Sequence, residues 1–91
     1  MFYVYVLQSD YDHGLYIGYS ADLKRRLRQH GEGKAFATSY RGPWKLIYYE
    51  AYGERADAEG RELFLKSGSG RRYLRKQLAQ HFAKHPLPTT A

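Results

Sequence analysis

The chain has 91 residues, enough for one domain and too few for a second hydrophobic core. It contains no cysteine, so disulfide scaffolds, iron–sulfur clusters and thiolate zinc sites are excluded. The net charge is +6, and two basic stretches, 21–48 and 66–91, flank an acidic one at 49–65. This distribution predicts a polyanion-binding surface with a local carboxylate site; a solvated basic face without a partner is the alternative.

The N-terminus is an apolar run of about seven residues, Met1–Leu7, with no basic region before it and polar residues directly after it. This pattern is typical of a strand rather than a signal peptide. No stretch approaches the roughly 20 apolar residues that a membrane-spanning helix needs. We therefore expect a cytoplasmic protein without a membrane partner.

Hydrophobic patterning and turn residues predict three strands and three helices. In chain order these are strands at 3–9 and 15–20, a helix at 21–30 capped by Ser20, a strand at 44–51, a helix at 55–66 and a helix at about 70–82 capped by Ser69. The first strand is apolar on both faces, which predicts a central position in the sheet. The expected fold class is α+β, a three-stranded antiparallel sheet flanked by helices in the order β-β-α-β-α-α. We expect the domain at residues 1–83 and a disordered C-terminal tail at 84–91.

The helix at 21–30 places charged residues on its inward side. At 100° per residue, Leu23 and Leu27 define the inward stripe, His30 falls within it and Arg26 lies on its edge. An arginine beside a core seam needs an anionic partner, which is either an internal carboxylate or a bound phosphate. For His30 the alternative is a core histidine hydrogen-bonded to a backbone carbonyl.

The helix at 55–66 gives a similar signal. Ala58, Glu62 and Leu65 share one face, and a second apolar face that includes Leu63 and Phe64 predicts a helix covered on two sides. Glu62 is therefore expected at a buried or cleft position. The alternative for Glu62 is a simple ion pair, with Arg26 as one possible partner.

Three short segments have the spacing of a known family. Tyr3-Val4-Tyr5 is followed by Tyr16-Ile17-Gly18, Tyr16 lies eleven residues after Tyr5, and Arg26 lies ten residues after Tyr16. Together with Arg61-Glu62, this pattern resembles the GIY-YIG nuclease domain over residues 3 to about 78. That family includes the incision domain of UvrC-type excinucleases, which act in DNA repair, and the catalytic domain of phage homing endonucleases. Tyr3 and Val4 replace the glycine and isoleucine of the first motif.

The resemblance implies a metal-dependent endonuclease that hydrolyses DNA phosphodiester bonds. Its catalytic residues would be Tyr5, Tyr16, Arg26, His30 and Glu62. Glu62 would hold Mg²⁺ or Mn²⁺, because Mg²⁺ needs only one or two carboxylates and keeps several waters. Arg26 would stabilise charge on the phosphate, one tyrosine would position or deprotonate the attacking water, and His30 would relay a proton or bind phosphate.

The expected partner is DNA, contacted through its phosphate backbone, with a targeting protein as a possible second partner. The basic residues expected to contact that backbone are Lys24, Arg25, Arg28, Arg41, Lys45, Arg71, Arg72 and Arg75. Many members of the family carry an asparagine after the glutamate, and this sequence contains none. A nucleic-acid-binding module without catalysis is therefore the main alternative, and a basic protein–protein adaptor is a weaker one.

Overall fold

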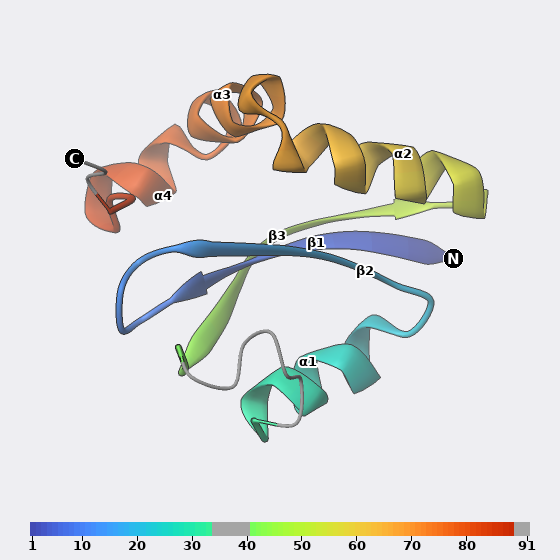
Figure 1. The fold of residues 1–91 in the computed structure, drawn as a ribbon, viewed down its shortest axis with the longest axis horizontal. Coiled ribbons are helices and arrows are strands. Elements are labelled where there is room, and N and C mark those ends of the chain that lie inside the picture. Colours follow the sequence, from blue (N-terminus) through green and yellow to red (C-terminus); the bar gives the residue numbers. More distant parts are fainter. Residues whose placement is uncertain (34–40, 89–91) are drawn as a thin grey trace.

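A computed structural model describes residues 1–33 and 41–88 as a three-stranded sheet with helices on both faces (Figure 1). The elements are β1 (Phe2–Ser9), β2 (Leu15–Ser20), α1 (Leu23–Gly31), β3 (Trp44–Tyr52), α2 (Arg55–Lys66), α3 (Gly68–Gln77) and α4 (Ala79–Lys84). The predicted α+β class and antiparallel sheet are confirmed, with one helix more than expected. Residues 34–40 lie outside the described part of the chain.

The sheet order is β2-β1-β3, and both pairings are antiparallel. The central place of β1 follows from its sequence, because side chains alternate between faces and both of its faces are buried. Val4 and Val6 face α2 and α3 and form the main core with Ile17, Leu65 and Leu74. Tyr5 points to the opposite face, the one that α1 covers (Figure 1).

Helix α1 begins later than predicted because Asp22, not Ser20, is its N-cap. The Asp22 side chain accepts a hydrogen bond from the backbone N–H of Arg25 at 3.1 Å. The Ser20 hydroxyl supports the turn before the helix, where it accepts from the backbone N–H of Asp22 at 3.0 Å. The predicted inward side of α1 is confirmed. The buried or half-buried side chains are Leu23, Arg26, Leu27 and His30, and the other basic side chains of the helix are exposed.

Helix α2 has the predicted bounds, but it is covered on one side only. Ala58 and Leu65 are fully buried against the sheet, whereas Leu63 is 71% exposed. The expectation of a helix sandwiched between two layers is therefore wrong. Only one layer of helices covers this face of the sheet in the described chain (Figure 1), so the second apolar side of α2 remains at the surface.

A charged cluster ties β3 to α2. The Arg61 guanidinium donates to both carboxylate oxygens of Glu50, from Nε at 2.8 Å and Nη2 at 3.0 Å. The hydroxyls of Tyr48 and Tyr52 also donate to Glu50, and Arg61 lies 4.4 Å from the ring centroid of Tyr73. Several of the abundant tyrosines thus have a structural role, because each offers an apolar ring and a polar tip.

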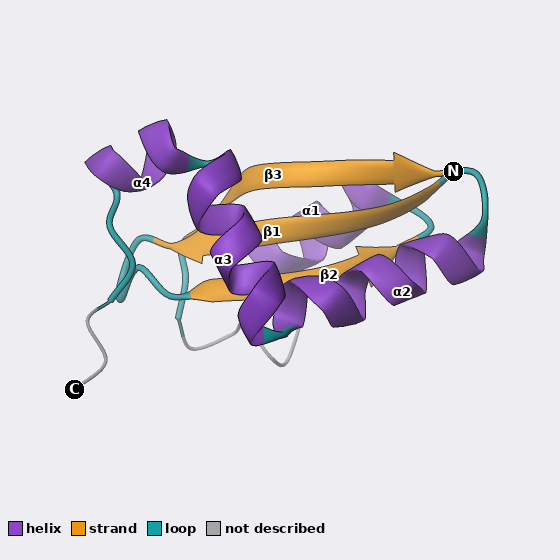
Figure 2. Ribbon diagram, turned by 90° about the horizontal axis from the view of Figure 1, so that it is seen from above, coloured by secondary structure: helices purple, strands orange, loops and turns teal. Residues whose placement is uncertain are grey.

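The single helix predicted at 70–82 is instead two helices. Helix α3 begins at Gly68, with the Ser67 hydroxyl accepting from the backbone N–H of Gly70 at 3.1 Å, so Ser67 rather than Ser69 is the cap. A Cβ at Gly70 would lie 1.9 Å from the backbone oxygen of Phe64, so only glycine permits α3 to pack this closely on α2. Leu78, at φ −110° and ψ 33°, separates α3 from α4 (Figure 2).

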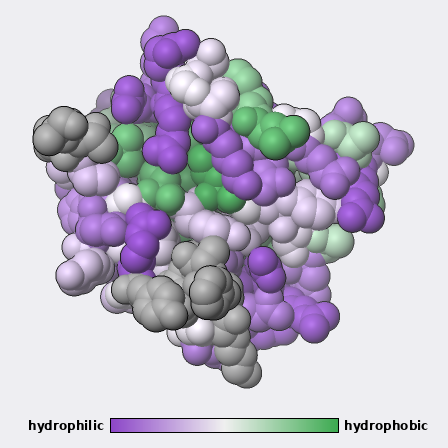
Figure 3. All heavy atoms as spheres, viewed as in Figure 1, coloured by the Kyte–Doolittle hydropathy of each residue, from purple (hydrophilic) through white to green (hydrophobic). Residues whose placement is uncertain are grey.

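The start of the expected tail contacts the sheet. The Gln8 side-chain amide donates to the backbone oxygen of His85 at 3.1 Å, and Leu87 packs against the core. The structure describes residues 84–88 of the expected tail, and residues 89–91 lie outside the described chain. On the face seen in Figure 3, hydrophobic side chains gather mainly between the upper helices and the sheet.

Candidate active site

Tyr5 and Tyr16 lie side by side on the face of the sheet that α1 covers. They come from the neighbouring strands β1 and β2, and their ring centroids are 6.2 Å apart with the planes tilted by 40°. Tyr5 is fully buried, whereas Tyr16 is half-buried. Of the two predicted tyrosines, Tyr16 is therefore the one whose surface reaches solvent.

His30 extends from the end of α1 onto both tyrosines. Its Nε2 lies 2.9 Å from the Tyr5 hydroxyl, and its ring meets those of Tyr5 and Tyr16 edge-on, with centroids 5.7 and 5.0 Å away. Burial lowers the pKa of His30, and the nearby charge of Arg26 lowers it further. His30 is therefore neutral at pH 7, and its Nε2 partner is a side-chain hydroxyl rather than a backbone carbonyl.

Arg26 lies one turn before His30 and faces the same tyrosines. Its Nη1 donates to the Gln29 side-chain oxygen at 3.1 Å, and its Nε is buried without a hydrogen-bond partner. The hydrogen bond to Tyr5 raises the pKa of Arg26 against the effect of burial, so the guanidinium stays charged. Within residues 1–33 and 41–88 Arg26 forms no ion pair, so the internal carboxylate considered as its partner is not there.

The buried position of Tyr5 determines its protonation. Burial raises the pKa of Tyr5 to about 12, although the Arg26 guanidinium opposes this by hydrogen bonding to the hydroxyl. The adjacent Arg26 therefore does not make Tyr5 acidic. At neutral pH Tyr5 is a phenol, which can share its proton with Nε2 of His30.

Gly18 makes room for this arrangement. It pairs with Tyr5 across the β1–β2 ladder, and a Cβ built on it would lie 2.5 Å from Cζ and from the hydroxyl of Tyr5. The same Cβ would lie 2.9 Å from Cε1 of Tyr16. The glycine of the Tyr-Ile-Gly segment is thus required by the close approach of both tyrosine side chains.

Trp44, which was not among the residues expected at the site, contacts it from β3. Its ring meets Tyr16 edge-on with centroids 6.3 Å apart, and the Arg41 guanidinium lies 4.8 Å from its centroid. Arg41 in turn pairs with Asp12 at 2.8 Å and, through that hydrogen bond, holds the pKa of Asp12 at about 2. No local sequence signal marks Trp44, because its contact depends on the pairing of β1 with β3. Gln29 was also missed, although its spacing of three residues from Arg26 on one helix is a signal.

A cavity of about 280 Å³ opens beside the Arg26 guanidinium. Its lining residues are Ser20, Ala21, Asp22, Arg25, Arg26 and Gln29. Two of these are arginines, and only Asp22 is acidic. The cavity therefore offers an anion access to Arg26 from solvent.

Glu62 lies apart from the other four predicted catalytic residues. It belongs to α2, which covers the opposite face of the sheet from α1 (Figure 1), and α2 contacts both β1 and β2. Its carboxylate pairs with Lys66 at 3.0 Å, one turn along the helix, and its side chain is 22% exposed. The ion pair considered as the alternative role of Glu62 is therefore present, but its partner is Lys66 and not Arg26.

The donor set fits a hard divalent cation that keeps much of its hydration. Among the described residues no group of three or more histidine or acidic side chains is gathered for a metal. Glu62 would therefore be the single protein ligand, which matches Mg²⁺ but no metal that needs a closed protein cage. Lys66 would have to leave the carboxylate when the cation binds.

The expected DNA-contacting residues fall into three groups. Lys24, Arg25 and Arg28 are exposed on α1, on the same face of the sheet as Tyr5. Arg41 is paired with Asp12, and Lys45 lies 3.7 Å from Asp10. Arg71, Arg72 and Arg75 belong to α3, on the other face (Figure 1). The sheet thus separates basic residues that the sequence suggested as one surface.

The fold and the tyrosine–arginine–histidine cluster agree with the family to which the spacing of the motifs pointed. A family model of the GIY-YIG catalytic domain matches residues 1–77, so the chain belongs to the GIY-YIG family, a family of nucleases. The chain is similar to the UPF0213 proteins of Streptococcus pyogenes serotype M5 (strain Manfredo) and serotype M3 (strain SSI-1). Each is 40% identical over 84 residues, which span 91% of this chain and 86% of the relative. No solved structure gives a significant match.

No helix within the described ranges is long and apolar enough to cross a membrane.

Proposed function

We propose that this chain is a metal-dependent endonuclease that hydrolyses DNA phosphodiester bonds beside Tyr16 and Arg26. The observation that carries the proposal is the state of Arg26. It is a half-buried guanidinium without a carboxylate partner in the described chain, it retains an unpartnered Nε, and it borders a solvent-accessible cavity. A phosphate diester supplies the missing anion, because its oxygens match the planar fork of an arginine.

Arg26 binds the phosphate and stabilises the charge that grows on its oxygens as water attacks. Its position is fixed before the substrate arrives, since Gln29 and the tyrosine hydroxyls hold the guanidinium in place. Donors that need no reorganisation during the reaction are the most effective at stabilising a transition state.

Tyr16 orients the attacking water, because it is the motif tyrosine that reaches solvent. Tyr5 and His30 support it from beneath. Their hydrogen bond at 2.9 Å fixes both rings against Tyr16, and His30, which is neutral at pH 7, is able to take up a proton through Tyr5. This assignment gives the two tyrosines different roles, in accord with their different burial.

Glu62 would hold a divalent cation as its single protein ligand. A bound Mg²⁺ or Mn²⁺ would supply Lewis acidity to the phosphate. Because α1 and α2 cover opposite faces of the sheet (Figure 1), the phosphate would have to reach the cation around β2, the edge strand that α2 contacts. Glu62 is suited to this role because its carboxylate is partly buried and has one exchangeable partner, Lys66.

The test is nicking of supercoiled plasmid DNA with Mg²⁺, with Mn²⁺ and with EDTA. We expect cutting that needs the metal and is lost in Glu62→Gln. Glu59→Gln is the matched control, because Glu59 lies on the same helix in an exposed pair with Arg55. Equal cutting by the wild type and by Glu62→Gln would indicate a contaminating nuclease and would refute the proposal.

A second candidate function is nucleic-acid binding without catalysis. The observation that favours it is the ion pair of Glu62 with Lys66, which occupies the expected metal ligand. It predicts DNA binding that falls steeply with salt, that is unchanged in Glu62→Gln, and that is never accompanied by nicking.

A further inference from the structure

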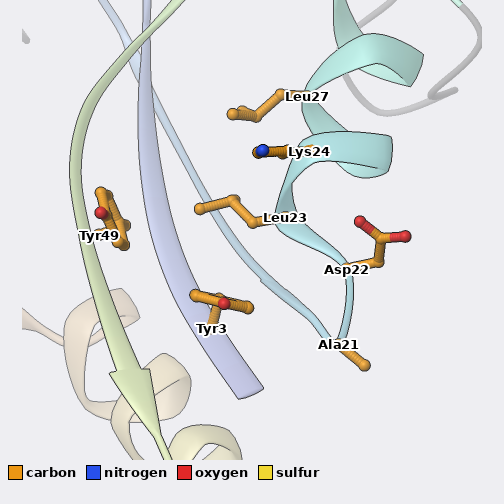
Figure 4. A pocket seen from close by; sticks show the side chains of 7 residues that line it. All are labelled: Tyr3, Ala21, Asp22, Leu23, Lys24, Leu27 and Tyr49. Carbon is orange, nitrogen blue, oxygen red and sulfur yellow. The ribbon is translucent and has the colours of Figure 1, made fainter. Parts of the chain in front are cut away.

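A second hollow lies on the other side of the start of α1. It is a groove of about 320 Å³ between α1 and the sheet, and Figure 4 shows the residues that line it. Tyr3 of β1 and Tyr49 of β3 form its floor, and Leu23, Lys24 and Leu27 point toward them from α1 (Figure 4). None of the catalytic roles assigned above uses this groove.

The floor of the groove is an open aromatic pair. The ring centroids of Tyr3 and Tyr49 are 6.3 Å apart with the planes tilted by 57°, and Tyr49 is 53% exposed. Tyr3 is also the residue that stands in place of the glycine of the first family motif. A glycine at position 3, as in the first family motif, would therefore leave the groove without one of its two tyrosine rings.

The charges around the groove favour an anionic ligand. Lys24 is exposed and points toward the tyrosines, whereas the Asp22 carboxylate points away from them and caps α1 (Figure 4). The groove shares Ala21 and Asp22 with the cavity at Arg26, so the two hollows adjoin. A ligand that spans both would place a planar apolar part on the tyrosines and an anionic part at the arginine.

We propose that the groove of Tyr3, Tyr49, Leu23, Lys24 and Leu27 binds an unpaired DNA base next to the phosphate held at Arg26. This inference rests on the proposed function, since it takes that phosphate to belong to the substrate. A tyrosine ring stacks on a base of any sequence, and a lysine beside it attracts the backbone. The base must be unpaired and unstacked, because bases inside a duplex already cover one another's faces. The substrate class is therefore DNA with a single-stranded or frayed segment at the cleavage site.

The test is equilibrium binding in EDTA, where no cleavage takes place. The probes are a fluorescent oligothymidylate and an abasic oligonucleotide of the same length, which keeps the phosphates and lacks the bases. We expect the wild type to bind the base-bearing probe about tenfold more tightly, the size of effect that one or two stacked bases produce. Tyr49→Thr and Tyr3→Val are expected to lose this preference while binding the abasic probe as before.

Two matched variants complete the design. Tyr49→Phe keeps the ring and should keep the preference. Tyr11→Ser removes a tyrosine that is 78% exposed in the turn between β1 and β2 and should also keep it. The proposal is overturned if both probes weaken equally in Tyr49→Thr, or if the wild type does not distinguish them. A dimer that dissociates in Tyr49→Thr while the base preference stays would assign the groove to a second copy of the chain.

The two proposals fail separately. If the protein prefers the base-bearing probe through Tyr49 but never nicks DNA, the base-binding groove is supported and the nuclease proposal is refuted. If the protein nicks DNA with Mg²⁺ and Tyr49→Thr binds both probes as the wild type does, the nuclease proposal is supported and the base-binding groove is refuted.

Discussion

Gly18 lies opposite Tyr5 in the β1–β2 ladder, so close that its missing side chain is what leaves room for the tyrosine ring. The pairing of Tyr5 with Gly18 therefore accounts both for the spacing of the tyrosines in the sequence and for their packing at the site. Tyr5 is placed by its pairing with Gly18, and Tyr16, two residues earlier on β2, lies on the same face because side chains alternate along a strand.

Gly18→Ala is predicted to lower the free energy of unfolding by about 1–3 kcal/mol, because the new methyl group must displace a buried ring. Gly60→Ala is the control. Nothing lies within 4 Å of a Cβ at Gly60 on α2, so alanine there should stabilise the protein by about 0.5–1 kcal/mol through its helix propensity. Urea unfolding measures both. Equal effects of the two substitutions would refute the close packing at Gly18.

Glu50→Gln is predicted to lower the free energy of unfolding by roughly 3 kcal/mol at neutral pH, because it leaves the half-buried Arg61 without its anion. Burial alone would raise the pKa of Glu50, but hydrogen bonds from Arg61, Tyr48 and Tyr52 lower it below its usual value. The stability that Glu50 provides is thus present above its unfolded pKa and is lost as pH falls through the folded one. Urea unfolding of Glu59→Gln, whose exposed pair is 3.8 Å long, should show a change below about 0.5 kcal/mol.

The His30–Tyr5 pair predicts a pH dependence of a definite sign. The folded pKa of His30 lies below the ordinary 6.5, so between the two values the unfolded state binds more protons. Stability is therefore full above about pH 7 and falls as the pH drops through 6.5 toward the folded pKa. His30→Gln removes the titrating group and should show a smaller loss in urea unfolding across this range. His81, whose pKa burial also lowers, is present in both proteins, so parallel pH profiles would contradict the account of His30.

The separation of the basic residues by the sheet predicts which face binds DNA. Arg28→Gln on α1 should weaken DNA binding and reduce the slope of log affinity against log salt by about one, because one phosphate contact is lost. Arg75→Gln on α3 is a matched control, since Arg75 is also exposed but lies on the opposite face. Salt titrations in EDTA measure both slopes. A reduced slope for Arg75→Gln alone would place the DNA on the face of α3.

Much of the fold was predictable because local signals determine it. The doubly apolar first strand indicated its central place, and the helix at 55–66 has the predicted bounds. The third helix was predicted as one piece because 70–82 contains no proline and no interior glycine after Gly70. The interruption at Leu78 arises in tertiary packing, where Leu78 and Phe82 both contact the core.

The site was predictable where one helix or one pair of strands determines it. Helical periodicity placed Arg26 and His30 on the inward side, and the spacing of the tyrosines placed them together. Periodicity alone does not reveal which face of the sheet a helix covers, so it did not show that the helix of Glu62 lies on the opposite face from α1 (Figure 1). The Tyr3–Tyr49 groove was missed for a related reason, because it forms only when β3 pairs with β1.

The most direct test of the central claim is the single-turnover rate of DNA cleavage by Arg26→Ala, compared with Arg55→Ala, which removes an exposed arginine that pairs with Glu59 on α2. Arg26→Ala should cleave about 10²- to 10³-fold more slowly, the loss expected when a positioned donor to the transition state is removed. Arg55→Ala should cleave at nearly the wild-type rate, and thermal melting should show both variants folded. An Arg26→Ala protein that cleaves as fast as the wild type would contradict the account.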